Sequence, residues 1–412
     1  MLNKTLFAKV LLLAGISLGT AACSSSEQTQ ATELSASESV ASFADASIKE
    51  AAAQYKYLMS RLPQDRLPKT YHAERDELET SGSEWWTSGF YPGTLLYLYE
   101  ETGDQALYDE AIRVLGLLEK EQHNTSTHDL GFMMYDSFGN VHRIKPSPAY
   151  KQVLLNSAKS LATRFNPKVG AIRSWDSAPE DFIVIIDNMM NLDLLFWATK
   201  ETGDSTYYDI AVTHANTTMQ HHFRPDNSSY HVINYNPATG EVQEKKTAQG
   251  AADESAWARG QAWGLYGFVD AYRETKDENY LQQAQRIADF TLHHPNLPQD
   301  KVPYWDFNAP GIPDALRDAS AAAITASALL ELNLYVGETK KKEYLQAAES
   351  ILRSLSSETY MAAPGTNGGF ILKHGVGHKP AGTEVDVPLT YADYYYVEAL
   401  KRYKALAEKE QA

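Results

Sequence analysis

The sequence predicts an all-α fold, a closed α/α toroid built from six helical hairpins, on three observations. From residue 45 onward, apolar side chains recur at helical spacing in twelve segments. A short turn phrase recurs where these segments meet, which is typical of repeated hairpins that share one core. Alternate segments are richer in apolar residues, as expected of an inner layer of helices covered on both sides. An open solenoid of the same hairpins is the alternative.

The predicted helices follow one another along the chain with few interruptions. They span residues 45–61, 86–101, 104–121, 130–137, 147–165, 181–201, 205–221, 251–275, 278–293, 314–336, 341–356 and 388–407. The second helix and every alternate one after it form the inner set. The outer helices, such as 278–293, carry more charge. Residues 230–235 alternate between apolar and polar, which predicts a short strand or hairpin.

The turn phrase explains how one hairpin leads to the next. Asp104 follows Glu-Glu-Thr-Gly and Asp204 follows Lys-Glu-Thr-Gly, while residues 274–277 and 338–341 resemble this phrase. We predict that a helix ends at each Glu-Thr pair and that Asp104, Asp204 and Asp277 cap the next helix. This regularity favours one domain over three.

Charge excludes several classes of partner. The 412 residues include 53 acidic and 37 basic side chains, for a net charge of −16. Such a surface disfavours nucleic acid and an anionic membrane surface as partners. The 25 Tyr and seven Trp residues suit the binding of sugar rings, but they equally suit an ordinary core.

The N-terminus predicts export. Residues 1–22 contain two lysines, an apolar stretch and small residues before a cleavage point, so we interpret them as a signal peptide. The only cysteine, Cys23, follows directly and resembles the lipid acceptor of a bacterial lipoprotein. Residues 23–43 are then a polar tether and 44–412 the helical domain. The protein is expected on the periplasmic or cell-surface side, touching the membrane only through this anchor; plain secretion with a free thiol is the alternative.

Asp187 is the first candidate for chemistry. Within the predicted helix 181–201 it lies in or beside an apolar stripe that includes Ile183, Ile186 and Met190, and Asn191 follows one turn later. A carboxylate among apolar side chains must be paired or be held neutral. Asp187 is therefore either a structural group or an acid whose pKa is raised by desolvation.

Three long turns are predicted at one end of the toroid, and we interpret that end as the mouth of a binding site. They span 121–129, 164–180 and 223–252. Loops of this length tend to be functional. Four clusters are expected to converge at the mouth: residues 85–93, residues 128–134, the Asp187 segment, and residues 247–250 with 255–264.

Arg259 and Trp263 form the clearest binding pair in these clusters. They lie one helical turn apart and so share a face. A guanidinium fork binds a sugar carboxylate through two hydrogen bonds, and an indole stacks on a sugar ring. Each residue could instead be structural, Arg259 in an ion pair and Trp263 in the core.

Six phrases in order resemble one known family. They are WTSGFYPG from Trp86, HDLGFM from His128, IIDNMMNL from Ile185, TAQG from Thr247, SAWARGQAWG from Ser255 and YADYYY from Tyr391. Together they resemble the unsaturated glucuronyl hydrolases of glycoside hydrolase family 88, from about residue 50 to the last helix. The resemblance implies an (α/α)6 toroid and removal of a 4-deoxy-4,5-unsaturated uronic acid from oligosaccharides released by polysaccharide lyases.

The resemblance also implies roles for individual residues. Asp187 matches the family's acid/base, and Asp129 matches its second carboxylate. Eight residues match substrate-contact positions: Trp86, His128, His231, Thr247, Gln249, Trp257, Arg259 and Trp263. Two alternatives remain, namely a related hydrolase of unsaturated rhamnogalacturonan fragments and a non-catalytic glycan-binding lipoprotein.

The sequence predicts no metal site and no cofactor. His221-His222 and His293-His294 are adjacent pairs, which point to different faces of a helix and are poor chelates. Zinc-protease and phosphate-loop motifs are missing from the sequence. A sugar epimerase on a similar toroid would need paired inner histidines, and no inner segment offers them.

Overall fold

The computed structural model describes residues 25–411, with side chains described from residue 42 to residue 409. The predicted signal peptide and Cys23 lie outside the described residues, so both stay predictions. Among the described residues, no helix is long and apolar enough to cross a membrane.

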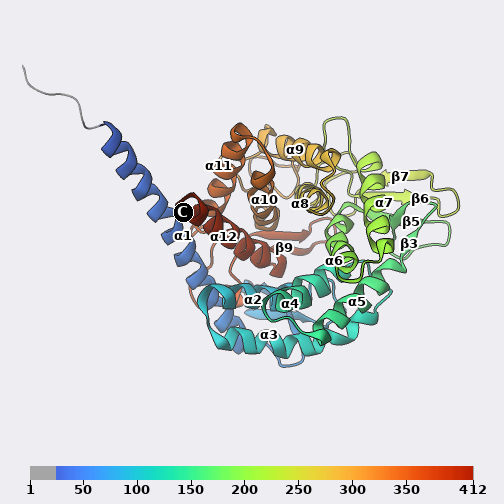
Figure 1. The fold of residues 1–412 in the computed structure, drawn as a ribbon, viewed down its shortest axis with the longest axis horizontal. Coiled ribbons are helices and arrows are strands. Elements are labelled where there is room, and N and C mark those ends of the chain that lie inside the picture. The colour runs from blue at the N-terminus through green and yellow to red at the C-terminus, as the bar shows by residue number, and fades with distance from the viewer. Residues whose placement is uncertain (1–24, 412) are drawn as a thin grey trace, which may run out of the picture.

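Six helical hairpins form a closed ring (Figure 1). The inner elements are α2 (Phe90–Thr102), a π-helical segment (Gly131–Gly139), α6 (Leu192–Thr202), α8 (Ala258–Thr275), α10 (Ala319–Leu332) and α12 (Thr390–Gln411). The outer ones are α1 (Ser25–Arg61), α3 (Gln105–Leu118), α5 (Pro148–Ala162), α7 (Ser205–His221), α9 (Glu278–His293) and α11 (Glu338–Leu355). A short helix, α4 (Asn140–Ile144), follows the π-helical segment.

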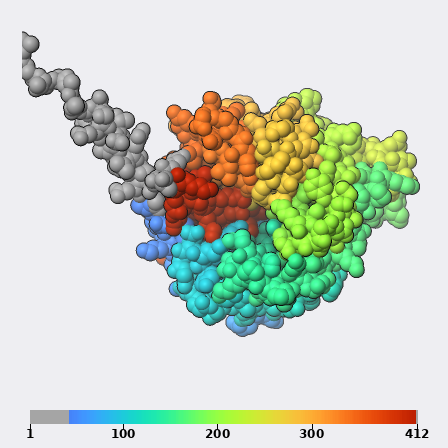
Figure 2. All heavy atoms as spheres, in the orientation of Figure 1, coloured from blue at the N-terminus to red at the C-terminus, as the bar shows by residue number. Residues whose placement is uncertain are grey.

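The ring closes between its first and last hairpins. Helix α12 packs against both α1 and α2, and in the space-filling view the red C-terminal helix lies against the blue and cyan N-terminal part of the chain (Figure 2). The predicted toroid is therefore confirmed, and the open solenoid is excluded. The layers are also as predicted: every residue of α10 is buried, whereas α9 buries one face.

The recurring turn phrase behaves as expected at three joints. Asp104, Asp204 and Asp277 each accept a hydrogen bond from the backbone N–H two residues later, as helix caps do. Gly103 and Gly203, with φ near +70°, reverse the chain before two of them. The fourth joint was wrongly predicted, because Glu338 already begins α11 and Gly337 precedes it in place of an Asp.

The predicted helix 181–201 is wrong in its first half. Residues Phe182–Ile185 form strand β5, Ile186–Asn191 form a 3-10 helix, and only then does α6 begin. Strand β5 pairs with β6 (Val232–Tyr235), which pairs in turn with β7 (Val242–Lys246). The β-branched run of residues 183–186 favours a strand once a partner is available, and the partner is the strand predicted at 230–235.

Other boundaries differ less. The inner helices expected from residues 86, 251 and 314 begin at Phe90, Ala258 and Ala319, because their predicted first turns belong to loops. Four more strands form two small antiparallel sheets in the connections between helices. Strand β1 (Leu67–His72) pairs with β2 (Glu77–Ser81), and β3 (Phe165–Asn166) pairs with β4 (Ala171–Ile172). Strands β8 (Gly375–His378) and β9 (Thr383–Val387) form a last hairpin near the site.

Helix α1 includes the segment expected to be a tether. Its packing against the ring is evident from Ala44 and Ile48, which are buried. The helix itself begins at Ser25, so residues 25–43 are helical. That they serve as a tether stays a prediction.

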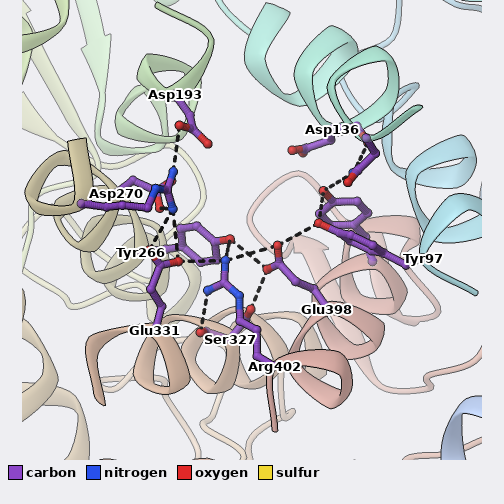
Figure 3. A network of polar contacts seen from close by, with 12 residues as sticks. Tyr97, Asp136, Asp193, Tyr266, Asp270, Ser327, Glu331, Glu398 and Arg402 are labelled. Carbon is purple, nitrogen blue, oxygen red and sulfur yellow. Dashed lines mark hydrogen bonds and ion pairs between the residues drawn. The ribbon is translucent and has the colours of Figure 1, made fainter. Parts of the chain in front are cut away.

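The inner helices all run the same way, which gives the ring two distinct ends. Farther along from the points where they begin, the inner helices surround a cavity of about 320 Å³ and a network of charged side chains (Figure 3). Arg273 pairs with Asp193, Asp270 and Glu331 at 2.6–2.9 Å. Arg402 pairs with Glu331 at 2.9 Å and Glu398 at 3.4 Å. These pairs link α6, α8, α10 and α12 across the centre of the ring.

Candidate active site

A second, smaller cavity lies at the end where the inner helices begin. Its volume is about 90 Å³, and nine residues line it: Trp86, His128, Asp129, Phe132, Trp175, Ile185, Asp187, Gln249 and Arg259. Eight of them come from the four clusters that the sequence placed at the mouth, and Trp175 comes from the predicted long turn 164–180. The cavity at the other end is larger, but its carboxylates are mostly paired with arginines. The two predicted catalytic carboxylates meet only in the smaller cavity.

The backbone around Asp187 fixes where its carboxyl points. The chain leaves β5 and turns into the 3-10 helix, whose second residue is Asp187. Ile186 anchors this turn by packing against Gly260 and Gly264 of α8, where a β-carbon would lie 3.5 Å from its side chain. A buried strand followed by a packed isoleucine thus aims the next side chain into the cavity.

The surroundings of the Asp187 carboxyl favour its protonated form. It is 8% exposed, and its Oδ2 has no hydrogen-bond partner among the described residues. Burial raises its pKa to about 7; the Arg259 charge acts in the opposite direction, and the negative charge of Asp129 raises the pKa further. Near neutral pH a large fraction of Asp187 is therefore protonated.

His231 faces Asp187 from the segment before β6. Its Nδ1 accepts hydrogen bonds from the N–H groups of Ala248 and Gln249 at 3.1 and 3.3 Å. Burial keeps the pKa of His231 well below its usual value, so the ring is neutral and its proton is on Nε2. This Nε2 lies 3.7 Å from Asp187 Oδ2, where its N–H favours the ionised carboxylate.

Asp129 is the second carboxyl of the cavity, just before the π-helical segment. Burial raises its pKa to about 7, while the Thr127 hydroxyl, the Asn191 side chain and the Arg164 charge act in the opposite direction. The Thr127 hydroxyl donates to Oδ2 over 3.3 Å. His128 Nε2 lies 3.3 Å from Oδ1, and burial lowers the pKa of His128 to about 3, so this histidine is also neutral.

Arg259 is in the cavity wall, but its donors are largely engaged within the protein. It pairs with Asp318 at 3.2 Å, and its Nη2 donates to the Gly377 carbonyl at 2.6 Å. The side chain is 1% exposed. The predicted fork around a substrate carboxylate is therefore not presented in this arrangement. The guanidinium instead anchors β8 and places a positive charge near Asp187.

Trp263 does not reach the cavity, and its predicted stacking on a sugar is corrected by the structure. The indole is fully buried between Phe132 and Tyr395, with ring centroids 5.0 and 5.3 Å away. These two aromatic side chains, from the π-helical segment and from α12, enclose it. The alternative interpretation, a core aromatic, is the one that the packing supports.

The remaining predicted contact residues divide into two groups. Trp86 and Gln249 line the cavity, and Gln249 also donates to the Gly377 carbonyl at 2.9 Å. Trp257 and Thr247 do not line the cavity. The Trp257 indole packs against the Arg259 guanidinium and the His231 ring, and the Thr247 hydroxyl accepts from the Gly250 N–H at 2.8 Å, which orders the turn.

Three residues with evident roles were not singled out from the sequence. Trp175 lines the cavity and is 37% exposed. The sequence feature that could have identified it is a lone tryptophan within one of the long turns predicted at the mouth. Arg164 joins two of these loops by donating to the carbonyls of Thr125 and Arg173. Asp318 holds Arg259. Their roles depend on contacts between distant segments, which no local pattern reveals.

A group of side chains able to bind a metal lies away from this site. Asp289, His293 and Glu343 approach one another on α9 and α11. The Lys340 ammonium pairs with both Asp289 and Glu343, so this group already contains a cation. His293, paired in the sequence with His294, thus joins acidic neighbours instead.

Comparisons with known proteins agree with the geometry. The family described as Glycosyl Hydrolase Family 88 matches residues 56–408. An unsaturated glucuronyl hydrolase of Formosa agariphila is 49% identical over 84% of this chain and 86% of its own length. An unsaturated chondroitin disaccharide hydrolase of Streptococcus pyogenes is 33% identical over 89% of this chain and 91% of its own.

Solved structures give the same result. The crystal structure of an unsaturated glucuronyl hydrolase specific for heparin superposes with a TM-score of 0.86 at 47% identity, covering 90% of this chain and 98% of that one. The Bacillus enzyme of the same name superposes with a TM-score of 0.82 at 32% identity, over 86% and 95% of the two chains. The chain therefore belongs to glycosyl hydrolase family 88 and is a glycoside hydrolase.

Proposed function

We propose that this enzyme removes the unsaturated uronic acid from the non-reducing end of lyase-generated oligosaccharides, with Asp187 as the acid. The observation that carries the proposal is a buried carboxyl with no hydrogen bond on one oxygen, a pKa raised to about 7, and a second carboxylate nearby. Relatives named for unsaturated glucuronyl and unsaturated chondroitin disaccharide substrates support the substrate class.

The chemistry follows from the enol ether C4=C5–O5 of such a sugar. Asp187 donates its proton to C4, the C4=C5 electron pair forms the new C–H bond, and positive charge develops across C5 and O5. The Asp187 carboxylate then takes a proton from water as the water oxygen bonds to C5. The resulting hemiketal opens to a ketone at C5, and the hemiacetal at C1 then expels the remaining sugar as an alcohol.

The neighbours of Asp187 suit this cycle. Burial favours the protonated acid before the first step, and the His231 N–H faces the carboxylate that forms after it. Asp129 would bind ring hydroxyls and stabilise the developing positive charge. The carboxyl separation of ordinary glycosidases is not a guide here, because no nucleophile attacks the glycosidic carbon.

The location of the enzyme is a second part of the proposal. Residues 1–22 support export, and Cys23 supports a lipid anchor on the outer side of the membrane. An enzyme held there would meet oligosaccharides as lyases release them. A Cys23→Ser variant in the native host is expected in the soluble fraction with unchanged activity; wild-type protein that is already soluble and carries no lipid by mass spectrometry contradicts the anchor.

A panel of unsaturated disaccharides tests the activity. The conjugated C4=C5 bond absorbs in the far ultraviolet, so hydration abolishes the absorbance. We expect loss of absorbance with at least one member of a glycosaminoglycan and ulvan panel, and none with Asp187→Asn. Release of an unsaturated rhamnogalacturonyl fragment alone would favour the related hydrolase instead. Binding without any loss of absorbance would indicate a glycan-binding protein.

A further inference from the structure

We propose that the larger cavity of the ring binds a small organic ammonium ion, held by the Asp136 carboxylate and by aromatic rings around it. The cavity has a volume of about 320 Å³, within the range of small-molecule sites, and shares no lining residue with the catalytic cavity. It is open to solvent, since the side chains of Arg143 and Asp193 in its wall are 51% and 20% exposed. The inference therefore does not depend on the proposed function.

The carboxylates around this cavity outnumber the cations that pair with them. Arg143, the third arginine of the lining, is engaged by the Glu100 carboxylate, with both contacts at 2.6 Å. Lys200 adds one cation, at Glu274. Arg273 and Arg402 between them pair with five carboxylates: Asp193, Asp270, Glu274, Glu331 and Glu398. The network thus carries an excess of negative charge, which a bound cation would balance.

Asp136, of the π-helical segment, is the lining carboxyl that has no cation of its own. Figure 3 shows it across the cavity from Asp193. Its Oδ2 is buried without a hydrogen bond to a described residue, and none of the ion pairs among the described residues includes it. Burial raises the pKa of this carboxyl well above its ordinary value, and the charges of Glu398 and Asp193 raise it further, while Tyr394 acts in the opposite direction. Asp136 therefore needs either a proton on it or a cation beside it.

The aromatic rings of the lining suit a cation with a carbon body. Six Tyr and Trp side chains line the cavity, and two of them, Tyr97 and Tyr266, already have an arginine over the ring, at 5.8 and 5.0 Å from the centroid. No lysine or arginine in the described part of the chain lies over Tyr135 or Trp197. These two rings lie 6.3 Å apart, so they can face one ammonium group together.

The other groups of the lining also favour an organic amine over a bare metal ion. Tyr395 is 2% exposed and lines the cavity, and no described residue hydrogen-bonds its hydroxyl, which can accept from an N–H group. Within residues 42–409, the one group of acidic and histidine side chains close enough to share a metal ion lies elsewhere: Asp289, His293 and Glu343. The cavity offers a carboxylate, a hydroxyl and ring faces, which together recognise an ammonium group.

Calorimetric titration of the whole enzyme at pH 7 tests the inference with three probes: tetramethylammonium, putrescine and glucosamine. We expect saturable binding of at least one of them, and none of the matched neutral compounds butane-1,4-diol and N-acetylglucosamine. Putrescine alone would identify an alkyl amine as the ligand, and glucosamine alone an amino sugar. A bound cation favours the ionised Asp136, so binding should release protons, and its heat should change with the ionisation enthalpy of the buffer.

Asp136→Asn keeps the shape of the side chain and removes its charge. It should weaken binding by about tenfold or more and reduce the proton release, while kcat/KM stays unchanged. Trp197→Leu, a second variant that leaves the carboxyl in place, should weaken binding by about threefold or more. Asp187→Asn is the matched control, because it removes a buried carboxyl from the other cavity, and its affinity for the probes should equal that of wild type.

Three results would overturn the inference. The first is that no ammonium probe binds saturably, or that potassium ions bind equally well. The second is equal affinity in the wild-type enzyme and in Asp136→Asn. The third is a loss of binding in Asp187→Asn with none in Asp136→Asn, which would place the ligand in the catalytic cavity.

Discussion

Single residues decide the chemistry of this site through burial. Asp187 has a raised pKa because water is excluded from its carboxyl, and Asp129 and the neutral His231 then adjust its proton affinity. Most of this was predictable from the sequence, since both carboxyl residues lie in motifs among apolar side chains. The tautomer of His231 was not, because it depends on two N–H groups of a separate loop.

The first prediction is that Asp187→Asn abolishes turnover and changes the pH dependence of stability. An amide cannot protonate C4, so activity should fall by about 10²–10⁴-fold. A carboxyl whose pKa is about 7 in the folded protein, against 3.8 ordinarily, contributes stability below pH 4 that is lost as the pH rises to 7. The variant should therefore gain in melting temperature relative to wild type as the pH rises from 4 to 7. A constant difference over that range would show that Asp187 is ionised throughout.

The second prediction concerns Arg259, for which the structure supports a different role from the one that the sequence predicted. Arg259→Ala leaves Asp318 buried without its partner, which typically costs about 3–5 kcal/mol of stability. It also frees the Val376 and Gly377 carbonyls, so β8 should shift and kcat should fall. Thermal unfolding and kinetics on the same preparation check this. A large rise in KM at unchanged melting temperature would contradict this role and would support direct contact between Arg259 and the substrate carboxylate.

At the scale of elements, the site depends on the change from strand β5 to a 3-10 helix to α6. The sequence predicted the helices and caps well, because helical spacing and Asp caps are local signals. It did not predict β5. That strand exists because β6, nearly fifty residues later, pairs with it. The segment that carries the catalytic acid is thus the one where tertiary contact overrides the local pattern.

The third prediction tests how α8 supports this segment. A β-carbon at Gly267 would lie 2.5 Å from the Met189 Cβ and 3.2 Å from its backbone, so Gly267→Ala must displace the 3-10 helix. Overpacking of this kind costs about 1–3 kcal/mol, and kcat should fall because Asp187 moves. Gly264→Ala is the control, since its nearest contacts are an ordinary 3.5–3.6 Å. Equal kcat values in the two variants would contradict the claim that close packing against α8 positions the 3-10 helix.

At the scale of the whole molecule, the ring separates catalysis from stability. The catalytic cavity lies where the inner helices begin, and the ion network, drawn in Figure 3, lies farther along them. Arg259 and Arg273 are both on α8, fourteen residues apart, which corresponds to about 21 Å of helix. The sequence predicted the ring and its mouth. It did not reveal the network, which needs partners from four helices.

The fourth prediction follows from this separation. Arg402→Ala removes a cationic partner from the buried carboxylates of Glu331 and Glu398, so the free energy of unfolding should fall by about 3–5 kcal/mol. The kcat/KM of the folded enzyme should stay unchanged, because the catalytic cavity is at the other end. Chemical denaturation and kinetics measured at low temperature check both parts. A loss of kcat without a loss of stability would mean that the two ends are coupled.

The central claim is that Asp187 protonates C4 before the glycosidic bond breaks. The most direct test follows the wild-type reaction in D₂O by NMR at early times. We predict that the C4=C5 signal disappears no later than the released sugar appears, and that deuterium enters one face of C4, since a fixed carboxyl delivers it. Release of the sugar while C4=C5 persists, or equal deuteration of both faces, would contradict the account.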